Sequence, residues 1–303
     1  MTLEQLRIFI AVAERGHLTQ AADALALTPS AVSSSIRALE ERYGTPLFDR
    51  IGRGIAVNEA GLLFLVEARA TLAAARNAEL ALADLAGLKR GTLAIYASQT
   101  IASYWLPPLL LRYRLRYPMI DLNLVIGNTT TVAAAVLDGT ANLGLVEDSV
   151  DEPELSAAVM AEDRIVVVVG PTHPWADGKP VSVETLLSAT WVMREQGSGT
   201  RAAFESRLAA LGGDIGRLQI ALTLPSNEAV RAAAMAGDCA TVVSELVVAS
   251  HLQTGLLRQV NFPLAPRAFS LLHHRQRQKS QAAQALERML LNPGGGRLSA
   301  GVD

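Results

Sequence analysis

The chain changes its hydrophobic pattern on either side of one long alanine-rich run, residues 58–90, and this change limits the possible folds more than any other feature. Before the run, apolar residues recur every three or four positions, which is typical of short amphipathic helices. From Gly91 onward, short apolar runs alternate with helical patterns, which is typical of a sheet with helical crossovers. The length of 303 residues agrees with about two domains. We therefore expect an α/β protein with a small helical N-terminal domain and a larger C-terminal domain.

The composition excludes several classes of protein. Half of the residues are hydrophobic and 18% are charged, which excludes a disordered or collagen-like chain. The longest purely aliphatic run, Ile165–Val169, is far shorter than the ~20 residues of a spanning helix, and no secretory signal precedes the first helix. A single cysteine, Cys239, rules out an internal disulfide framework and is expected to be a small core residue. We expect a soluble cytoplasmic protein without a membrane segment, metal site or cofactor.

Three short helices are predicted before the alanine-rich run. The apolar face of the first helix is formed by Leu3, Leu6, Phe9, Ile10 and Ala13. A second helix spans Thr19–Leu25, and Thr28 and Pro29 suit the N-cap and the first residue of a third. The apolar face of the third helix is formed by Val32, Ile36, Leu39 and Tyr43.

The opposite face of the third helix carries small polar side chains. Two helices joined by a tight turn, with such a face on the second, form a helix-turn-helix arrangement. Small hydroxyls allow a close approach to base edges and phosphates, and an arginine can reach the DNA backbone. The candidate DNA contacts on the helices are Thr19, Thr28, Ser30, Ser33, Ser34, Ser35 and Arg37. The alternative is an ordinary helical hairpin with solvated arginines.

Alternating apolar residues around a Gly-Arg-Gly turn predict a β-hairpin, or wing, at residues 47–57. Arg53 is expected at its tip, where an arginine can enter a minor groove or contact phosphate. Together with Arg50 and Arg37 it would form a basic edge. Residues 1–60 contain six arginines and seven carboxylates, and the whole chain has a net charge of −2. So few cations predict modest DNA affinity for each subunit and a need for several subunits on one site.

The alanine-rich run predicts one long helix that begins after Asn58 and continues to about Lys89. At ~1.5 Å per residue this helix would be about 45–50 Å long. Its leucines are more than a small N-terminal domain can bury, so we expect it to pair with a helix of a second copy. A solvated spacer is the alternative.

Motifs in the first 61 residues resemble those of the LysR-type transcriptional regulators, and the resemblance extends over the whole chain apart from its glycine-rich end. The motifs are LRIFIAVAE at 6–14, TQAA at 19–22, AVS at 31–33, IRALE at 36–40, GTPLFDR at 44–50 and AG at 60–61. The resemblance implies a winged helix-turn-helix that binds promoter DNA, a dimerising linker helix and a two-lobed, periplasmic-binding-protein-like effector domain. It also implies assembly as a homodimer or homotetramer.

The third helix departs from the family pattern. Pro29-Ser30 and Ser34-Ser35 stand where members often have Gln-Pro and Arg-Gln pairs, so long side chains that read bases in a bidentate manner are missing. Sequence specificity would then depend more on Arg53, hydroxyl contacts and DNA shape.

The resemblance and the patterning together predict the domain boundaries. We expect a DNA-binding domain at 1–58, a linker helix at 59–90, an effector domain at 91–292 and a disordered tail at 293–303. Within the effector domain, lobe I comprises 91–163 and 267–292, and lobe II comprises 164–266, with crossing strands near Arg164 and Pro266. The predicted strands are 93–97, 120–126, 142–147, 164–169, 191–194, 218–224, 240–243 and 267–272. The predicted helices are 105–117, 129–137, 183–187, 201–211, 228–235 and 282–290.

Polar residues follow the ends of the predicted strands, where ligands collect in sheets of this class. Lobe I provides Ser98, Gln99, Thr100, Asn128, Thr129 and Glu147. Lobe II provides Gly197, Ser198, Gly199, Thr200, Arg201, Ser226 and Asn227. Hydroxyls, amides, glycines and one arginine suit a small oxyanion or a phosphorylated or carboxylated metabolite. Ordinary helix capping is the alternative for each residue.

The Gly-Ser-Gly-Thr-Arg string at 197–201, with Glu147 and Ser98–Thr100, resembles the LysR-type subgroup that controls carbon-fixation and sulfur-assimilation genes. This resemblance implies a sulfur oxyanion or a phosphorylated metabolite as the effector.

Two other functions were weighed. An enzyme is not expected, because no catalytic motif accompanies the glycine-rich string, and His273 and His274 beside three cationic residues indicate a solvated basic loop. A two-lobed solute-binding protein without a DNA-binding role would also present polar loops, but the helix-turn-helix pattern and the missing secretory signal argue against it.

Overall fold

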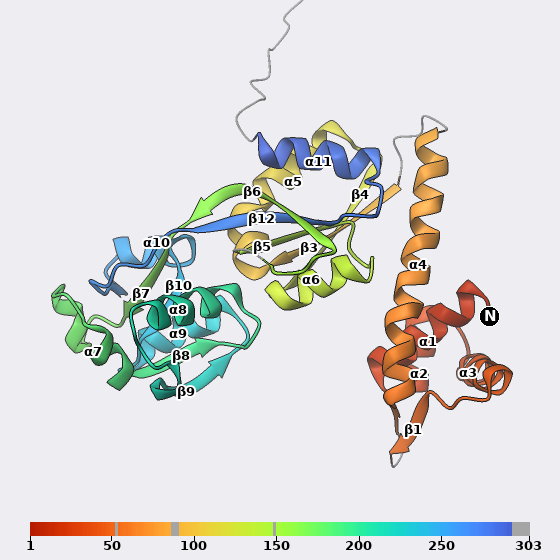
Figure 1. The fold of residues 1–303 in the computed structure, drawn as a ribbon, viewed down its shortest axis with the longest axis horizontal. Coiled ribbons are helices and arrows are strands. Elements are labelled where there is room, and N and C mark those ends of the chain that lie inside the picture. Colours follow the sequence, from red (N-terminus) through yellow and green to blue (C-terminus); the bar gives the residue numbers. More distant parts are fainter. Residues whose placement is uncertain (52–53, 86–90, 148–149, 293–303) are drawn as a thin grey trace, which may run out of the picture. The chain divides into compact units, whose positions relative to one another are not determined.

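The computed structural model describes residues 1–51, 54–85, 91–147 and 150–292 (Figure 1). The chain forms two compact units, an N-terminal one that begins at Met1 and a C-terminal one that contains the larger sheets. Arg53 and the glycine-rich end at 293–303, both interpreted from the sequence, lie outside the described residues.

The N-terminal unit consists of helices and one small hairpin. Its elements are α1 (Leu3–Arg15), α2 (Leu18–Leu25), α3 (Pro29–Tyr43), β1 (Phe48–Ile51), β2 (Gly54–Val57) and α4 (Glu59–Leu85). Phe9 of α1 is fully buried, with its ring centroid 5.4 Å from that of Phe48 and 4.8 Å from that of Phe64. The apolar residues Val32, Ile36 and Leu39 of α3 pack into the same core, as the sequence predicts.

Capping residues fix where α3 begins. The Thr28 hydroxyl accepts a hydrogen bond from the Ala31 backbone N–H at 3.2 Å, and Pro29 occupies the first turn. The turn before it places Ala26 at a φ of +54°, a left-handed conformation that costs an alanine energy. The predicted turn between the second and third helices is therefore confirmed.

Lobe I of the C-terminal unit is built on a five-stranded sheet in the order β4-β3-β5-β12-β6 (Figure 1). The strands are β3 (Gly91–Ser98), β4 (Ile120–Gly127), β5 (Leu143–Glu147), β6 (Leu155–Asp163) and β12 (Arg267–His274). The helices are α5 (Pro107–Arg116), α6 (Thr129–Leu137) and α11 (Gln281–Leu291), with a π-helical turn at Ile101–Trp105. β3 pairs in parallel with β4 and β5, as βαβ units require, whereas β12 pairs antiparallel with β5 and β6.

Lobe II contains two small sheets. The strands are β7 (Ile165–Val169), β8 (Thr190–Arg194), β9 (Gln219–Leu224), β10 (Thr241–Ser244) and β11 (Arg258–Gln259). The helices are α7 (Val183–Ser188), α8 (Gly199–Ala210), α9 (Asn227–Ala236) and α10 (Glu245–Gln253), with 3-10 turns at Pro174–Asp177 and Ile215–Arg217. β8 and β9 pair in parallel, and β7 lies between β10 and β11. The chain enters this lobe from β6 and leaves it into β12, so β6 and β12 are the two crossing strands.

Two expectations about this unit were wrong. The sequence pattern predicts no strand at Leu155–Asp163, because five of the nine residues are alanine or acidic and obscure the alternation of apolar and polar positions. It also assigns His273 and His274 to a solvated loop, but β12 continues through both residues and pairs them with Ser156 and Leu155 of β6. His274 is consequently buried, and burial lowers its pKa.

Cys239 is buried and its thiol donates to the Ala233 carbonyl oxygen at 3.5 Å, which confirms the expected core position. Among the described residues, no helix combines the length and the hydropathy needed to cross a bilayer.

Candidate ligand site and nucleic-acid interface

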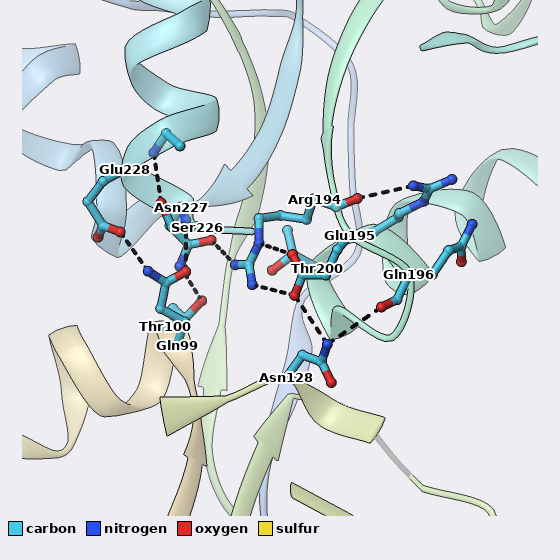
Figure 2. Close-up of polar contacts among 12 residues, drawn as sticks. Gln99, Thr100, Asn128, Arg194, Glu195, Gln196, Thr200, Ser226, Asn227 and Glu228 are labelled. Atoms are coloured by element: carbon cyan, nitrogen blue, oxygen red, sulfur yellow. Dashed lines mark hydrogen bonds and ion pairs between the residues drawn. The ribbon is translucent and has the colours of Figure 1, made fainter. Parts of the chain in front are cut away.

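The carboxyl ends of three lobe I strands bring polar side chains to one edge of the sheet. Ser98 ends β3 opposite Gly127 of β4, and Glu147 ends β5 on the other side of β3. Ser98, Thr100 and Glu147 are all buried, with 1%, 0% and 3% of their surfaces exposed. The N-termini of α8 and α9 in lobe II face this edge, and Figure 2 shows the polar contacts between the two lobes. The predicted convergence of these loops on one region is confirmed.

The N-terminus of α9 is occupied by side chains from lobe I. Gln99 Oε1 accepts from the Asn227 backbone N–H at 2.8 Å, and Gln99 Nε2 donates to Glu228 Oε2 at 2.6 Å. Asn227 Nδ2 donates to Thr100 Oγ1 at 3.1 Å, and the Tyr104 hydroxyl donates to Glu228 Oε1 at 2.7 Å. Burial, with the hydrogen bond to Glu228 and its charge, raises the pKa of Tyr104 to about 12. These contacts hold the lobes together without any added molecule.

A second bridge runs through Arg194 and Glu195. The guanidinium of Arg194 pairs with both carboxylate oxygens of Glu195, at 2.8 and 2.9 Å, and donates to Asn227 Oδ1 at 2.6 Å. Asn128 of lobe I donates through Nδ2 to Glu195 Oε1 at 3.2 Å (Figure 2). Burial acts to raise the pKa of Glu195, but the Arg194 charge and hydrogen bonds, together with Asn128, outweigh it and lower the pKa below its ordinary value.

The N-terminus of α8, unlike that of α9, is not capped by a side chain. Ser198 occupies the N-cap position of α8, but its hydroxyl makes no capping hydrogen bond, whereas Ser226 caps α9 through the Ala229 N–H. The hydroxyl oxygens of Ser98 and Thr129 are buried and have no hydrogen-bond partner among the described residues. Donors that are left without partners in the interior carry a free-energy penalty. The first N–H groups of α8 therefore have no side-chain cap, although Thr200 in its first turn accepts a hydrogen bond from Arg267 of lobe I at 3.0 Å.

Glycines allow α8 to approach lobe I closely. A Cβ on Gly199 would lie 2.7 Å from Thr129 Oγ1 and 3.0 Å from the Glu147 Cβ, so a larger residue cannot occupy the position without a shift. A Cβ on Gly197, whose φ is +87°, would lie 2.8 Å from Thr130 Oγ1. These glycines therefore allow the start of α8 to approach lobe I, and their predicted role in binding an anion stays a prediction.

Arg267 lies at the base of the interface, where β12 begins. Its Nε donates to Asp163 Oδ2 at 2.8 Å, and its Nη1 donates to Thr200 Oγ1 at 3.0 Å. Ser244 donates to the other oxygen of Asp163 at 2.6 Å. Burial raises the pKa of Asp163, while the charge of Arg267 and the hydrogen bonds act in the opposite direction. Arg267 Nη2 lies 3.8 Å from Glu147 Oε1, which is too long for a hydrogen bond.

Arg201 occupies a different position from the one that an anion-binding role suggests. Its Nε pairs with Glu205 at 2.7 Å, and its Nη1 donates to the Arg194 carbonyl oxygen at 3.1 Å. The cationic residues that the structure brings to the interface, Arg194 and Arg267, were not among the sequence candidates. Neither follows a motif: Arg194 ends a strand and Arg267 begins one, and their partners are distant in the sequence.

The candidate DNA contacts lie on the surface of the N-terminal unit. Thr19, Thr28, Ser30, Ser34, Arg37 and Arg50 are exposed, and Ser33 and Ser35 are half-buried. The hairpin β1–β2 is fixed against α3 and α4 by two side chains. Glu40 Oε1 accepts from the Leu47 N–H at 2.7 Å, and Asn58 Nδ2 donates to the Pro46 carbonyl oxygen at 3.1 Å. These two hydrogen bonds connect α3 and the segment before α4 to Pro46 and Leu47, which lead into β1.

Within the described ranges, no three histidine, cysteine or acidic side chains gather closely enough to hold a metal ion.

Two family models match the chain. The model described as a bacterial regulatory helix-turn-helix protein of the lysR family matches residues 3–62, and the LysR substrate binding domain matches residues 69–292.

Full-length relatives are similar over nearly the whole chain. The uncharacterized HTH-type transcriptional regulator YeiE of Escherichia coli strain K12 is 38% identical over 285 residues, covering 93% of this chain and 94% of that protein. The RuBisCO operon transcriptional regulator of Allochromatium vinosum is 32% identical over 294 residues, covering 96% of both. A relative named as a RuBisCO operon regulator thus agrees with the carbon-fixation part of the subgroup resemblance.

Solved structures share the fold. Full-length CbnR in complex with its target DNA has a TM-score of 0.66 at 22% identity, and the match covers 97% of this chain and 99% of that one. The regulatory domain of CcmR from Synechocystis PCC6803 in complex with 2-PG has a TM-score of 0.62 at 23% identity, covering 68% and 99%. With family models matching at 3–62 and 69–292, the chain belongs to the LysR family of DNA-binding transcriptional regulators with an effector-binding domain.

Proposed function

We propose that this regulator binds promoter DNA through the exposed face of α3 and the β1–β2 wing and is switched by a small anion bound between the lobes. The observation that carries the second part is the start of α8. Its first backbone N–H groups have no side-chain cap, the Thr129 hydroxyl lies close to Gly199, and among the described residues the buried hydroxyls of Thr129 and Ser98 have no hydrogen-bond partner. A helix N-terminus and hydroxyl donors together favour a negative ligand.

The two lobes supply the means of switching. Lobe I contributes Ser98, Thr129 and Glu147, and lobe II contributes the start of α8, so a ligand here would contact both lobes. Such a ligand changes the relative stability of different lobe arrangements only if it binds one arrangement better than another. The direct contacts of Gln99 and Asn128 with lobe II define the arrangement that the ligand must favour or disrupt.

The DNA-binding half of the proposal includes an assembly of several subunits. Few cations are available on the N-terminal unit, so one subunit alone would bind weakly. Among the described side chains of α4, four apolar ones are more than half exposed: Leu62, Leu63, Val66 and Leu82. We propose that they pack against α4 of a second copy, in a homodimer or homotetramer. Sedimentation equilibrium of Leu63→Glu would test this, because a charge on the paired face should lower the mass of the assembly.

A selection experiment tests the proposed function as a whole. Duplexes enriched from a random library by the full-length protein would be used in gel shifts with and without sulfite, sulfate, thiosulfate and sugar phosphates. We expect at least one anion to change the affinity for DNA or the footprint. A full-length protein that enriches no duplex would refute the DNA-binding half, and indifference to every anion would refute the switching half.

A double variant locates the switch. Ser98→Ala with Thr129→Val removes two hydroxyls that have no protein partner, so the protein should remain as stable as the wild type. We expect DNA binding to persist and the response to the anion to disappear. The matched control is Thr223→Val, which removes an exposed hydroxyl from β9. A double variant that responds like the control would place the anion elsewhere.

A further inference from the structure

One short segment of lobe I, residues 99–104, contacts the first turn of α9 in lobe II. Gln99 bonds to the Asn227 N–H at 2.8 Å and to Glu228 at 2.6 Å (Figure 2). Thr100 and Tyr104 add one hydrogen bond each, to Asn227 and Glu228 respectively. Short contacts thus join a single segment of one lobe to two consecutive residues of the other. We call these five residues the α9 clasp: Gln99, Thr100, Tyr104, Asn227 and Glu228.

Tyr104 provides the apolar part of the clasp. Its half-buried ring packs against the core of lobe II, on a cluster that includes Val230 and Ala234 of α9. An aromatic side chain that combines such packing with a hydrogen bond is a typical anchor of an interface. The pKa of Tyr104 is raised to about 12, chiefly by burial, so the hydroxyl keeps its proton at every physiological pH. It is therefore always available as a donor to Glu228.

The backbone around Tyr104 has an uncommon form. Ile101–Trp105 is a π-helical turn, and the Leu106 N–H donates to the Ile101 carbonyl oxygen at 2.8 Å. Pro107 and Pro108 follow directly, and neither has an N–H that could extend an α-helical ladder back through the turn. π-helical turns are rare and frequently occur at functional sites. The two prolines therefore separate this turn from α5, and the turn presents Tyr104 to lobe II.

The backbone N–H of Asn227 reports on the state of the clasp. Asn227 is the first residue of α9, and the first N–H groups of a helix have no acceptor within the helix. Its acceptor is Gln99 Oε1 of the other lobe. The Ala229 N–H is instead capped at 3.1 Å by Ser226, which belongs to the same lobe. Release of the clasp would therefore expose the Asn227 N–H and leave the Ala229 N–H bonded.

We infer that the α9 clasp holds the effector domain in its resting arrangement, and that release of the clasp is the step that switches this regulator. All members of the clasp are protein groups, so the clasped arrangement is stabilised by the chain itself. A ligand that prefers an arrangement already predominant changes the populations little, whereas one that prefers the released arrangement changes them strongly. The inference rests on the proposed function in one respect, that the arrangement of the lobes controls DNA binding.

Tyr104→Phe tests whether the contacts act together. The change removes the hydroxyl that donates to Glu228 and keeps the ring on lobe II. Hydrogen exchange of the full-length protein, measured at single-residue resolution, should show the Asn227 N–H exchanging at least about tenfold faster, because a hydrogen bond to a charged group contributes that much. The Ala229 N–H should exchange at the wild-type rate.

Tyr113→Phe is the matched control. It removes a phenolic hydrogen bond of 2.9 Å to the Ala282 carbonyl oxygen, but both partners lie in lobe I, so exchange at Asn227 should match the wild type. Glu228→Gln is a second clasp variant, which keeps the side-chain size and removes the charge that two donors share. It should behave as Tyr104→Phe does, and it decides the matter if thermal unfolding shows that Tyr104→Phe is not folded.

Footprints on a duplex enriched by the wild-type protein test the switching step. With no anion added, the two clasp variants should share a footprint or an affinity that differs from that of the wild type. Tyr113→Phe should reproduce the wild type, because its change does not reach lobe II.

The outcomes separate the inference from the proposed function. Three results would overturn the inference and leave the proposed function intact: wild-type exchange at Asn227 in a folded clasp variant, an equal rise at Ala229 that indicates fraying of α9, or a wild-type footprint from a clasp variant whose exchange has risen. If the wild type enriches no duplex, the DNA-binding half of the proposed function fails, and the switching step fails with it.

Discussion

The surface of the N-terminal unit and the interface between the lobes use similar side chains under opposite conditions. On α3, hydroxyls and arginines such as Ser30, Ser34 and Arg37 are exposed. At the interface, Thr100, Arg194 and Asn227 are almost completely buried and hydrogen-bonded through Asn227. An exposed polar group can hydrogen-bond to water before it binds DNA, whereas a buried polar group that loses its partner reduces the free energy of unfolding. Substitutions should therefore affect binding alone in the first region and stability in the second.

The largest expected effect is at Arg267. Replacing it with Met leaves Asp163 and Glu147 buried without their cation, so unfolding should become easier by about 3–5 kcal/mol. Urea unfolding of the full-length protein measures this change. Arg164→Met is the control, because the ion pair of Arg164 with Glu245 at 3.4 Å is exposed and should contribute under about 1 kcal/mol. Equal losses from the two variants would contradict the contrast between buried and exposed polar groups.

A smaller loss is expected at Asn227. Its side chain joins Arg194 at 2.6 Å to Thr100 at 3.1 Å, so Asn227→Ala leaves a buried donor unsatisfied. We expect a destabilisation of about 1.5–3 kcal/mol and faster hydrogen exchange in the segment around Gln99. Asn261→Ala serves as the control, since Asn261 is exposed and donates only to the Gly178 carbonyl oxygen. Unchanged exchange near Gln99 would show that this contact does not hold the lobes together.

A third prediction concerns Arg37, an exposed side chain on α3 of the N-terminal unit. Arg37→Ala should weaken DNA binding by about tenfold and reduce the slope of affinity against salt by about one, because one phosphate contact is lost. Its unfolding free energy should stay within about 0.5 kcal/mol of the wild type. Gel shifts over a range of salt concentrations measure the first effect and urea unfolding the second. Arg258→Ala, exposed in lobe II, should change neither. A strongly destabilised Arg37→Ala would break the comparison.

The smallest effect depends on pH. The pKa of Glu195 lies below its ordinary value in the folded protein, so its pairing with Arg194 stabilises the fold at neutral pH. This contribution is lost as the pH falls through the folded pKa, since the unfolded chain takes up the proton first. Glu195→Gln should be less stable than the wild type by under about 1 kcal/mol at pH 7, and the difference should shrink towards about pH 4. A difference that grows on acidification would contradict the assigned direction.

The sequence predicted features that depend on neighbouring residues better than contacts between residues far apart in the chain. Thr28 and Pro29 mark the start of α3, and Ser98 and Glu147 mark strand ends, because each acts on residues near it in the chain. The positions of Arg194 and Arg267 could not be predicted in the same way. Arg267 meets Asp163 and Thr200 only after lobe II has folded between them. β6 was not predicted because small and acidic residues weaken its alternation of apolar and polar positions. The two histidines at the end of β12, which pair with β6, were for the same reason assigned to a loop.

Membership of the family bears on the two alternative functions, an enzyme and a two-lobed solute-binding protein. Its members are transcriptional regulators, so an enzyme is excluded, and the helix-turn-helix match at residues 3–62 goes against a simple solute-binding protein.

The strand order of lobe I has a consequence for synthesis on the ribosome. β6 has β12 as its one neighbour in the five-stranded sheet, yet about 100 residues of lobe II are translated between them. At about 5–20 residues per second, β6 therefore waits roughly 5–20 seconds for its partner. During that interval its backbone donors and acceptors are open to other strands. A nascent chain stalled before residue 267 should for this reason require a chaperone, whereas one released after residue 292 should not.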